Sequence, residues 1–282
     1  MTWLLEFVNV DYIYPGTSQT AIQGLTLRIP IGKRCAVIGQ NGCGKTTLFL
    51  LANSLYKPQK GRIFWQGKQL TYDRLSLTQH RQKVGLVFQN PEQQLIALTV
   101  EEDISYGLCN LDFSEPIISQ KVEQALTEFD LISLAKRPIH QLSLGQKKRV
   151  SLADVMVLEP ELLILDEPTA YLDPLHTRQL TQNLNTIHEN GTTLLIATHD
   201  LEWVNSWADW IFVLDQGKLI LEGTPQEVFQ QHEILDSLQL GVPLGFELLS
   251  LLDEIERTST AKQEIEKIRN KILQKLKSKP VI

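Results

Sequence analysis

Gly39-Gln40-Asn41-Gly42-Cys43-Gly44-Lys45-Thr46 is the stretch that decides the fold of this chain. Its spacing is G-x-x-x-x-G-K-[ST], in which glycines let successive backbone N–H groups turn inward around phosphate oxygens. An apolar run at 36–38 precedes it and a helix-like run at 47–50 follows it, so the order is strand, loop, helix. The stretch therefore predicts an α/β fold with a phosphate site at a helix N-terminus.

The side chains of this loop have expected tasks. Lys45 would hold the β- and γ-phosphates, and the Thr46 hydroxyl would bind Mg²⁺. We expect ATP to contact Gly39, Gln40, Asn41, Gly42, Cys43, Gly44, Lys45, Thr46 and Thr47. A thiol near a helix N-terminus can have a lowered pKa, so we also expect bound ATP to protect Cys43 from alkylation.

Two carboxylates end another apolar run. Residues 162–165 are Leu-Leu-Ile-Leu and lead directly into Asp166 and Glu167. In open α/β sheets, ligands bind at the carboxyl ends of the strands. We expect Asp166 to orient Mg²⁺ and Glu167 to polarise the attacking water as general base.

Apolar patterning divides the rest of the chain. Alternation through Leu5, Val8 and Tyr12 indicates a β-rich start that ends in a turn at 15–16. The short runs at 36–38, 162–165 and 194–197 indicate strands buried on both faces of a parallel sheet. Between residues 91 and 157 the spacing is mostly helical, with one apolar face formed by Val122, Ala125, Leu126 and Phe129.

The end of the chain has a different character. Two helices are predicted between residues 246 and 276 by the apolar residues Leu248, Leu251, Leu252, Ile255, Ile265, Ile268, Ile272 and Leu276. We expect a nucleotide-binding domain over 1–225, with a helical subdomain at about 91–157, and a C-terminal helical extension over 226–282.

Composition narrows the class of protein. The 282 residues are 43% hydrophobic and carry 27 basic and 33 acidic residues, a formal charge of -6, which argues against nucleic acid as a partner. No run approaches the roughly 18 to 20 apolar residues needed to span a bilayer, and no export signal is evident. The three cysteines lack the spacing of a zinc site or redox motif, which favours a reduced cytoplasmic compartment.

A third motif identifies a family. Leu142-Ser143-Leu144-Gly145-Gln146-Lys147-Lys148-Arg149, just ahead of the run that carries Asp166, resembles the signature of the ABC ATPases. The resemblance covers residues 1 to about 225. It implies that Ser143, Gly145 and Gln146 contact ATP bound by an opposing subunit, so that a homo- or heterodimer encloses two nucleotides. A serine cap followed by a basic helix is also the ordinary structural interpretation of this segment.

Four further residues match the family in order and place. The resemblance implies that Gln89 touches Mg²⁺, that Asp173 spans the dimer interface, and that His199 contacts the γ-phosphate, so that the expected catalytic residues are Glu167, His199 and Lys45. Tyr14 resembles the aromatic residue that stacks on adenine. Tyr12 remains a competitor for that position.

The signature departs from the family at Leu144, where glycine is usual. A branched side chain restricts the backbone there. If this position must approach phosphate or adopt a positive φ, the composite site that uses this signature is weakened. The departure favours a heterodimer, in which a partner supplies a better signature.

One region resembles a narrower group. Residues 88–95, FQNPEQQL, followed by 99–103 and 106–107, are similar to the ATPases of energy-coupling-factor importers, which include cobalt and nickel systems. This implies a transmembrane coupling protein, a membrane substrate-binding subunit and a peripheral position at the cytoplasmic face of the cell membrane. The alternatives are an ATPase of another ABC transporter class and a soluble non-transport ABC ATPase. A nucleotide-binding regulator without turnover is disfavoured because Glu167 is present.

Overall fold

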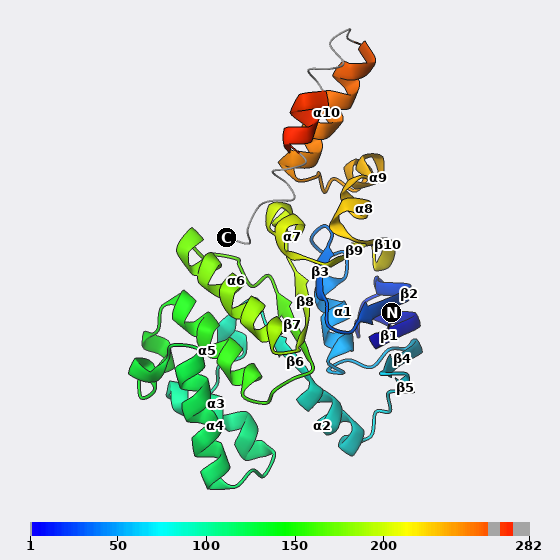
Figure 1. The fold of residues 1–282 in the computed structure, drawn as a ribbon. Coiled ribbons are helices and arrows are strands. Elements are labelled where there is room, and N and C mark those ends of the chain that lie inside the picture. The colour runs from blue at the N-terminus through cyan, green and yellow to red at the C-terminus, as the bar shows by residue number, and fades with distance from the viewer. Residues whose placement is uncertain (1, 259–265, 273–282) are drawn as a thin grey trace.

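The computed structural model describes residues 2–258 and 266–272. Within them, six strands form a central sheet in the order β10-β9-β3-β8-β7-β6, which is parallel except for β10 (Figure 1). The strands are β3 (Arg34–Ile38), β6 (Val84–Val87), β7 (Leu162–Asp166), β8 (Thr193–Ala197), β9 (Trp210–Asp215) and β10 (Lys218–Gly223). The prediction of buried parallel strands at 36–38, 162–165 and 194–197 is confirmed.

The core lies on both faces of this sheet. In β7, Leu162 and Ile164 belong to one cluster of buried side chains, and Leu163 and Leu165 belong to another on the opposite face. Helix α1 (Lys45–Ala52) packs in the first cluster. Helices α5 (Leu144–Met156) and α6 (Pro174–Glu189) pack in the second. Because both faces are covered, the strand tolerates only apolar residues until its carboxyl end.

An antiparallel sheet of order β2-β1-β4-β5 lies beside α1 (Figure 1). Its strands are β1 (Trp3–Ile13), β2 (Thr20–Pro30), β4 (Lys60–Trp65) and β5 (Lys68–Gln69). Leu5 and Tyr12 are buried as the alternation predicts, but Val8 is 38% exposed. The pairing shifts register between Phe7 and Val10, where Asn9 has a φ of 50°. This bulge turns Val8 outward and Val10 inward.

The region between β6 and β7 is helical, as predicted. Figure 1 shows its helices gathered on the side of the central sheet away from the antiparallel sheet. It contains η1 (Pro91–Gln93), α3 (Val100–Asn110), α4 (Glu115–Glu128), η2 (Ile132–Leu134), η3 (Ile139–Gln141) and α5. The buried face of α4 includes Ala125 and Leu126, with Phe129 buried at its C-cap.

The remaining helices connect and extend the central sheet. They are α2 (Arg74–Lys83), α7 (Leu201–Trp207), α8 (Pro225–Phe229), α9 (His232–Ser237) and α10 (Leu244–Thr258), and residues 266–272 are also helical. Leu248, Leu251, Leu252 and Ile255 fall in α10, and Ile268 and Ile272 fall in 266–272. Ile265 and Leu276 lie outside the described residues.

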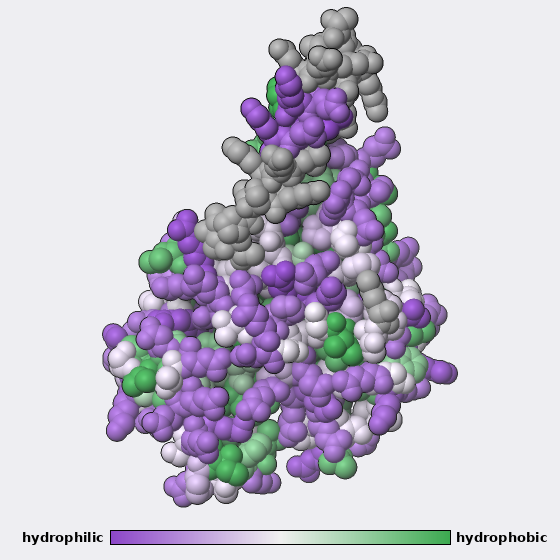
Figure 2. All heavy atoms as spheres, viewed as in Figure 1, coloured by the Kyte–Doolittle hydropathy of each residue, from purple (hydrophilic) through white to green (hydrophobic). Residues whose placement is uncertain are grey.

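Polar residues cover most of the face shown in Figure 2, with small separate apolar patches. Among the helices that the structure describes, none combines the length and hydropathy needed to cross a membrane.

Candidate nucleotide site

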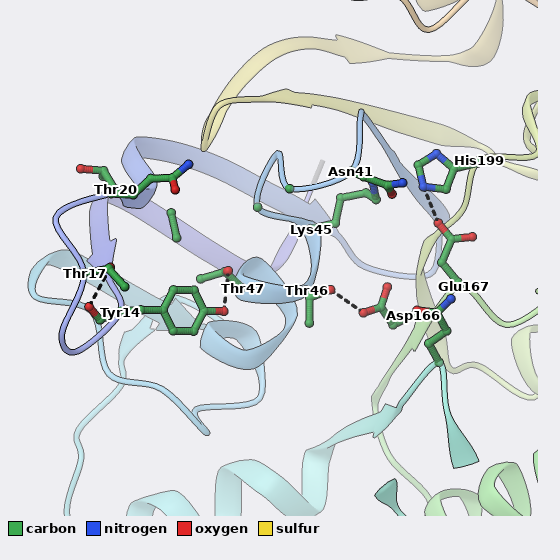
Figure 3. A pocket seen from close by; sticks show the side chains of 15 residues that line it. Tyr14, Thr17, Thr20, Asn41, Lys45, Thr46, Thr47, Asp166, Glu167 and His199 are labelled. Carbon is green, nitrogen blue, oxygen red and sulfur yellow. Dashed lines mark hydrogen bonds and ion pairs between the residues drawn. The ribbon is translucent and has the colours of Figure 1, made fainter. Parts of the chain in front are cut away.

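Four neighbouring strands bring the predicted residues to one edge of the central sheet. The phosphate loop follows β3, Glu167 follows β7, His199 follows β8 and Gln89 follows β6. A cavity of about 450 Å³ opens at this edge (Figure 3). Its lining includes the predicted residues Tyr14, Asn41, Gly42, Gly44, Lys45, Thr46, Thr47, Gln89, Asp166, Glu167 and His199.

The phosphate loop requires glycine for two physical reasons. Gly44 has a φ of 111°, and a Cβ there would lie 2.7 Å from the Ala21 carbonyl oxygen. A Cβ on Gly39, whose φ is 156°, would collide with the Leu214 carbonyl oxygen. Since α1 begins directly after Gly44, its free N–H groups face the cavity and favour an anion.

Lys45 lies along the loop that precedes it. Its Nζ donates hydrogen bonds to the Gly39 carbonyl at 2.7 Å and to the Gln40 carbonyl at 3.1 Å. The side chain is 8% exposed and also lines the cavity. A buried ammonium group is thereby held at the position where phosphate charge would be bound.

Thr46 and Asp166 meet across the cavity floor. The Thr46 hydroxyl donates to Asp166 Oδ2 at 2.7 Å (Figure 3), and burial raises the pKa of the Asp166 carboxyl. A hydroxyl, a carboxylate and the nearby Gln89 amide are oxygen donors of the kind that Mg²⁺ binds. In the part of the chain described, no group of three or more His, Cys, Asp or Glu side chains could hold a metal ion. A magnesium ion here would therefore rely on phosphate and water for its other ligands.

Glu167 and His199 face each other above this pair. Glu167 Oε1 lies 3.1 Å from His199 Nε2 (Figure 3). Burial raises the pKa of Glu167 to about 7, whereas burial, and then Lys45, lower the pKa of His199. Both side chains reach the same end of the cavity.

Tyr14, rather than Tyr12, reaches the cavity. Its hydroxyl lies 2.9 Å from Thr47 Oγ1, and its ring packs edge-on against those of Tyr12 and Tyr56. Tyr12 is 6% exposed and belongs to the core, so it does not compete. Sequence reasoning missed the neighbouring lining residues Thr17, Gln19, Thr20 and Ala21. The sequence feature that could have identified them is the polar turn that follows Tyr14.

The expectation for Cys43 is wrong in one respect. Its thiol is 4% exposed and belongs to the hydrophobic core, and burial raises its pKa. Lys45 acts in the opposite direction but does not overcome the burial. The expectation of a lowered pKa is therefore wrong, whereas protection of Cys43 from alkylation by ATP stays a prediction. Gly39, Gln40 and Cys43 are not among the residues that line the main cavity.

The signature lies elsewhere on the molecule. Ser143 caps α5 and forms a reciprocal pair of bonds with Gln146, and a Cβ on Gly145 would lie 3.3 Å from His176 Cδ2. Asp173 caps α6 by accepting a hydrogen bond from the His176 N–H at 2.9 Å. None of these residues lines the cavity of its own chain.

Leu144 is the first residue of α5, and its φ is not positive. Its side chain is 40% exposed. The backbone reason for glycine at this position therefore does not apply to this chain. Only the size of the side chain distinguishes Leu144 from the usual residue.

Comparison with known proteins agrees with this geometry. A family model described as ABC transporter matches residues 22–170. An ABC transporter ATP-binding protein of Nostoc sp. is 62% identical over 96% of this chain and 97% of its own length. An energy-coupling factor transporter ATP-binding protein, EcfA, of Methanococcus maripaludis is 37% identical over 90% of this chain and 91% of its own length.

Two solved structures are also similar. That of cbiO1 from Clostridium perfringens, described as part of the ABC transporter complex cbiONQ, has a TM-score of 0.75 at 37% identity and covers 89% of this chain and 100% of its own. The ATP-binding cassette MJ0796, a dimer bound to ADP and Pi, has a TM-score of 0.71 at 27% identity and covers 79% of this chain and 99% of its own. The chain belongs to the ABC transporter family, in which it is an ATP-binding subunit whose ATP hydrolysis energises transport.

Proposed function

We propose that this chain energises an importer of the energy-coupling-factor type that carries a cobalt or nickel ion or a vitamin. It would act with a second ATP-binding subunit, a transmembrane coupling protein and a separate membrane substrate-binding subunit, at the cytoplasmic face of the cell membrane. Likeness to EcfA and to cbiO1 along some nine-tenths of the chain supports this assignment. Residues 1–225 would form the nucleotide-binding domain and 226–282 the extension.

Within the nucleotide site, we assign each role from the position of the residue in the cavity. Lys45 and the N-terminus of α1 would bind the phosphates, and Tyr14 would stack on adenine. Thr46, Asp166 and Gln89 would hold Mg²⁺, which neutralises charge on the transferred phosphoryl group. Glu167 would accept the proton of the attacking water, and His199 would contact the γ-phosphate.

The observation that carries the transport proposal is a groove beside Gln89. A cavity of about 240 Å³ lies where the helical region meets the central sheet, and its lining includes Leu55, Arg81, Phe88 and Tyr106. Leu55 and Tyr106 are 45% and 50% exposed, although both are large apolar side chains. Such a groove fits a short helix of a membrane partner. Because Phe88 precedes Gln89 directly, the groove adjoins the nucleotide site.

Phe88, at the start of the segment 88–103, lines this groove, and hydrogen bonds within the segment hold it in place. Gln94 accepts a hydrogen bond from the Phe88 N–H at 3.3 Å and donates to the Ser151 carbonyl at 2.8 Å, which joins the end of β6 to α5. Asp103 Oδ1 accepts from the N–H groups of Ile96 and Ala97 at 2.9 and 2.8 Å. Gln89 directly follows Phe88, so a backbone shift at Gln89 would act on the Phe88–Gln94 hydrogen bond that connects β6 to α5. Nucleotide would drive the partner only by its different affinity for the closed and open dimers.

The first test is recovery of the complex. The tagged chain would be purified from gently solubilised membranes, and co-purifying proteins would be identified by mass spectrometry. We expect a multispanning coupling protein, together with the subunit that recognises the solute. Recovery of only soluble or ribosomal partners would overturn the transport proposal and leave the ATPase intact.

A matched pair of variants locates the contact. Leu55→Asp places a charge in the groove and should remove the coupling protein while nucleotide binding persists. Ile132→Asp is the control, since Ile132 is 62% exposed and lies outside the groove. Equal recovery of the coupling protein with both variants would count against this groove as the docking site.

A further inference from the structure

Lys148, on α5, is bound to the loop that carries Glu167. Its Nζ donates to the backbone carbonyls of Ala170 at 2.7 Å and Pro168 at 2.9 Å, with the Glu167 carbonyl at 3.5 Å. An ammonium group has three N–H donors, and three carbonyl oxygens of one short segment lie within 3.5 Å of this one. Hydrogen bonds from a charged donor are stronger than neutral ones, so this contact fixes the segment firmly.

The segment needs such a contact because its backbone is strained. Glu167 has a φ of 46° and Tyr171 a φ of 63°, both in the left-handed region that branched and bulky residues avoid. Within the loop, the Ala170 N–H donates to the Glu167 carbonyl at 3.1 Å. The Glu167 N–H donates to the Ala197 carbonyl of β8 at 2.9 Å. Lys148 is the side chain that ties the other end of this turn to a rigid helix.

We propose that Lys148 is a positioning residue for ATP hydrolysis: it holds the 167–170 loop so that the Glu167 carboxylate stays directed at the cavity beside His199. The proposal rests on the proposed role of Glu167 as general base. In Figure 3 the Glu167 side chain reaches toward His199 and Lys45 from the end of β7. A rotation of the loop would carry this carboxylate out of reach of a water at the γ-phosphate.

The same contact joins two sites. Leu144 and Lys148 are four residues apart on α5 and so lie on one face of the helix. At the start of α5 is the signature, which in a dimer would meet the partner's nucleotide; one turn later Lys148 holds this chain's own Glu167. A shift of α5 when the signature engages would therefore reach the carboxylate that hydrolyses the other ATP. Lys148 thus supplies a short link between binding in one site and hydrolysis in the second.

The test compares variants of the full-length chain with the wild type in steady-state ATPase assays. Lys148→Gln removes the charge and one donor. A displacement of about 1 Å in a catalytic group can cost about a hundredfold, so we expect kcat to fall about 10- to 100-fold. We expect KM for Mg-ATP to change less than about twofold, because Lys148 itself does not line the nucleotide cavity. Lys121→Gln is the control, since Lys121 pairs with Glu159 at 2.6 Å far from this loop, and its kcat should be unchanged.

Chemical rescue of the ammonium group distinguishes a positioning role of Lys148 from a general role in the stability of the fold. In a Cys109→Ser background, which removes the exposed thiol, Lys148→Cys would be purified and treated with 2-bromoethylamine to restore an ammonium group at nearly the same length; Cys35 and Cys43 are buried. Recovery of kcat with no change in KM supports the proposal. Wild-type kcat in Lys148→Gln, a loss that appears only in KM, a loss that aminoethylation leaves in place, or failure of both variants to fold would each overturn it.

Glu167→Gln, measured in parallel, keeps the two proposals distinct. If that variant retains turnover, the assignment of Glu167 as general base fails whatever Lys148 does. If it abolishes turnover and Lys148→Gln does not reduce it, only the positioning role fails.

Discussion

At the scale of single residues, the site depends on where burial places each charge. Glu167 is the proposed general base: its carboxylate lies beside His199, whereas the Asp166 carboxylate is bonded to Thr46. General base catalysis contributes about 10²- to 10⁴-fold, and we expect Glu167→Gln to reduce phosphate release by that factor with ATP binding retained. Glu189→Gln, at the exposed end of α6, should behave as wild type.

The pH dependence of hydrolysis has a predictable sign. Burial raises the pKa of Glu167 to about 7, and a general base must be deprotonated to act. Activity is therefore present above pH 7 and is lost as the pH falls through about 7. Measured as kcat/KM for Mg-ATP, which reports the free enzyme, the profile should show one acid limb near that value. A limb with its midpoint near the ordinary glutamate pKa would contradict a buried base.

The residues of the site were predictable where a sequence motif coincided with the end of a predicted strand. Asp166 ends β7, and Glu167 and His199 follow β7 and β8. These strands are adjacent in a parallel sheet, so the three side chains had to meet at one edge. The chemistry of Cys43 was not predictable in the same way. A motif gives its distance from a helix N-terminus but not the packing behind the loop, and here packing decides the pKa.

At the scale of elements, the start of α5 is where this sequence differs from the usual signature, because leucine stands at position 144 instead of glycine. Leu144 has an unstrained backbone, so any effect must come from its half-exposed side chain next to the capping box of Ser143 and Gln146. We expect Leu144→Gly to raise ATPase activity, because it removes bulk where the signature would approach phosphate. A glycine in the first turn costs up to about 1 kcal/mol. Tm should therefore fall by about 2–4 °C.

Two measurements check this prediction together. The rate of phosphate release measures the activity of the nucleotide site, and the Tm measures the stability lost when glycine replaces leucine in α5. Equal ATPase activity in the wild type and Leu144→Gly would mean that leucine is harmless in the signature, and would remove the reason for expecting a heterodimer.

Helices and strands were predictable from the spacing of apolar residues where those residues are buried. The central strands and the helix containing Ala125 and Leu126 follow their apolar patterns closely. The exception, Val8, shows why the rest is harder. One extra residue at the Phe7–Val10 bulge moves the inward-pointing positions from odd to even residue numbers. The sequence places apolar residues at both Phe7 and Val8, so it does not show which of the two points outward.

At the scale of the whole molecule, the positions of Lys45 and Ser143 predict how two chains would assemble around ATP. Lys45 lines the cavity and Ser143 does not. In the proposed dimer, Ser143 would instead contact the nucleotide held by the second chain. We expect Lys45→Ala and Ser143→Arg each to inactivate a homodimer, since each defect then occurs in both sites. In a mixed dimer, both defects fall in one shared site and the other site is intact. Random mixing of the two inactive chains should thus restore about a quarter of wild-type turnover.

The control for that experiment is built from the same variants. A chain carrying both Lys45→Ala and Ser143→Arg, mixed with wild type, places one defect in each site of the mixed dimer and should add no activity beyond that of the wild-type homodimers. If the separate variants fail to complement each other while the chains demonstrably exchange, the two motifs serve the same chain's nucleotide. If they complement, the exposed start of α5 is half of an active site that only a second subunit can complete.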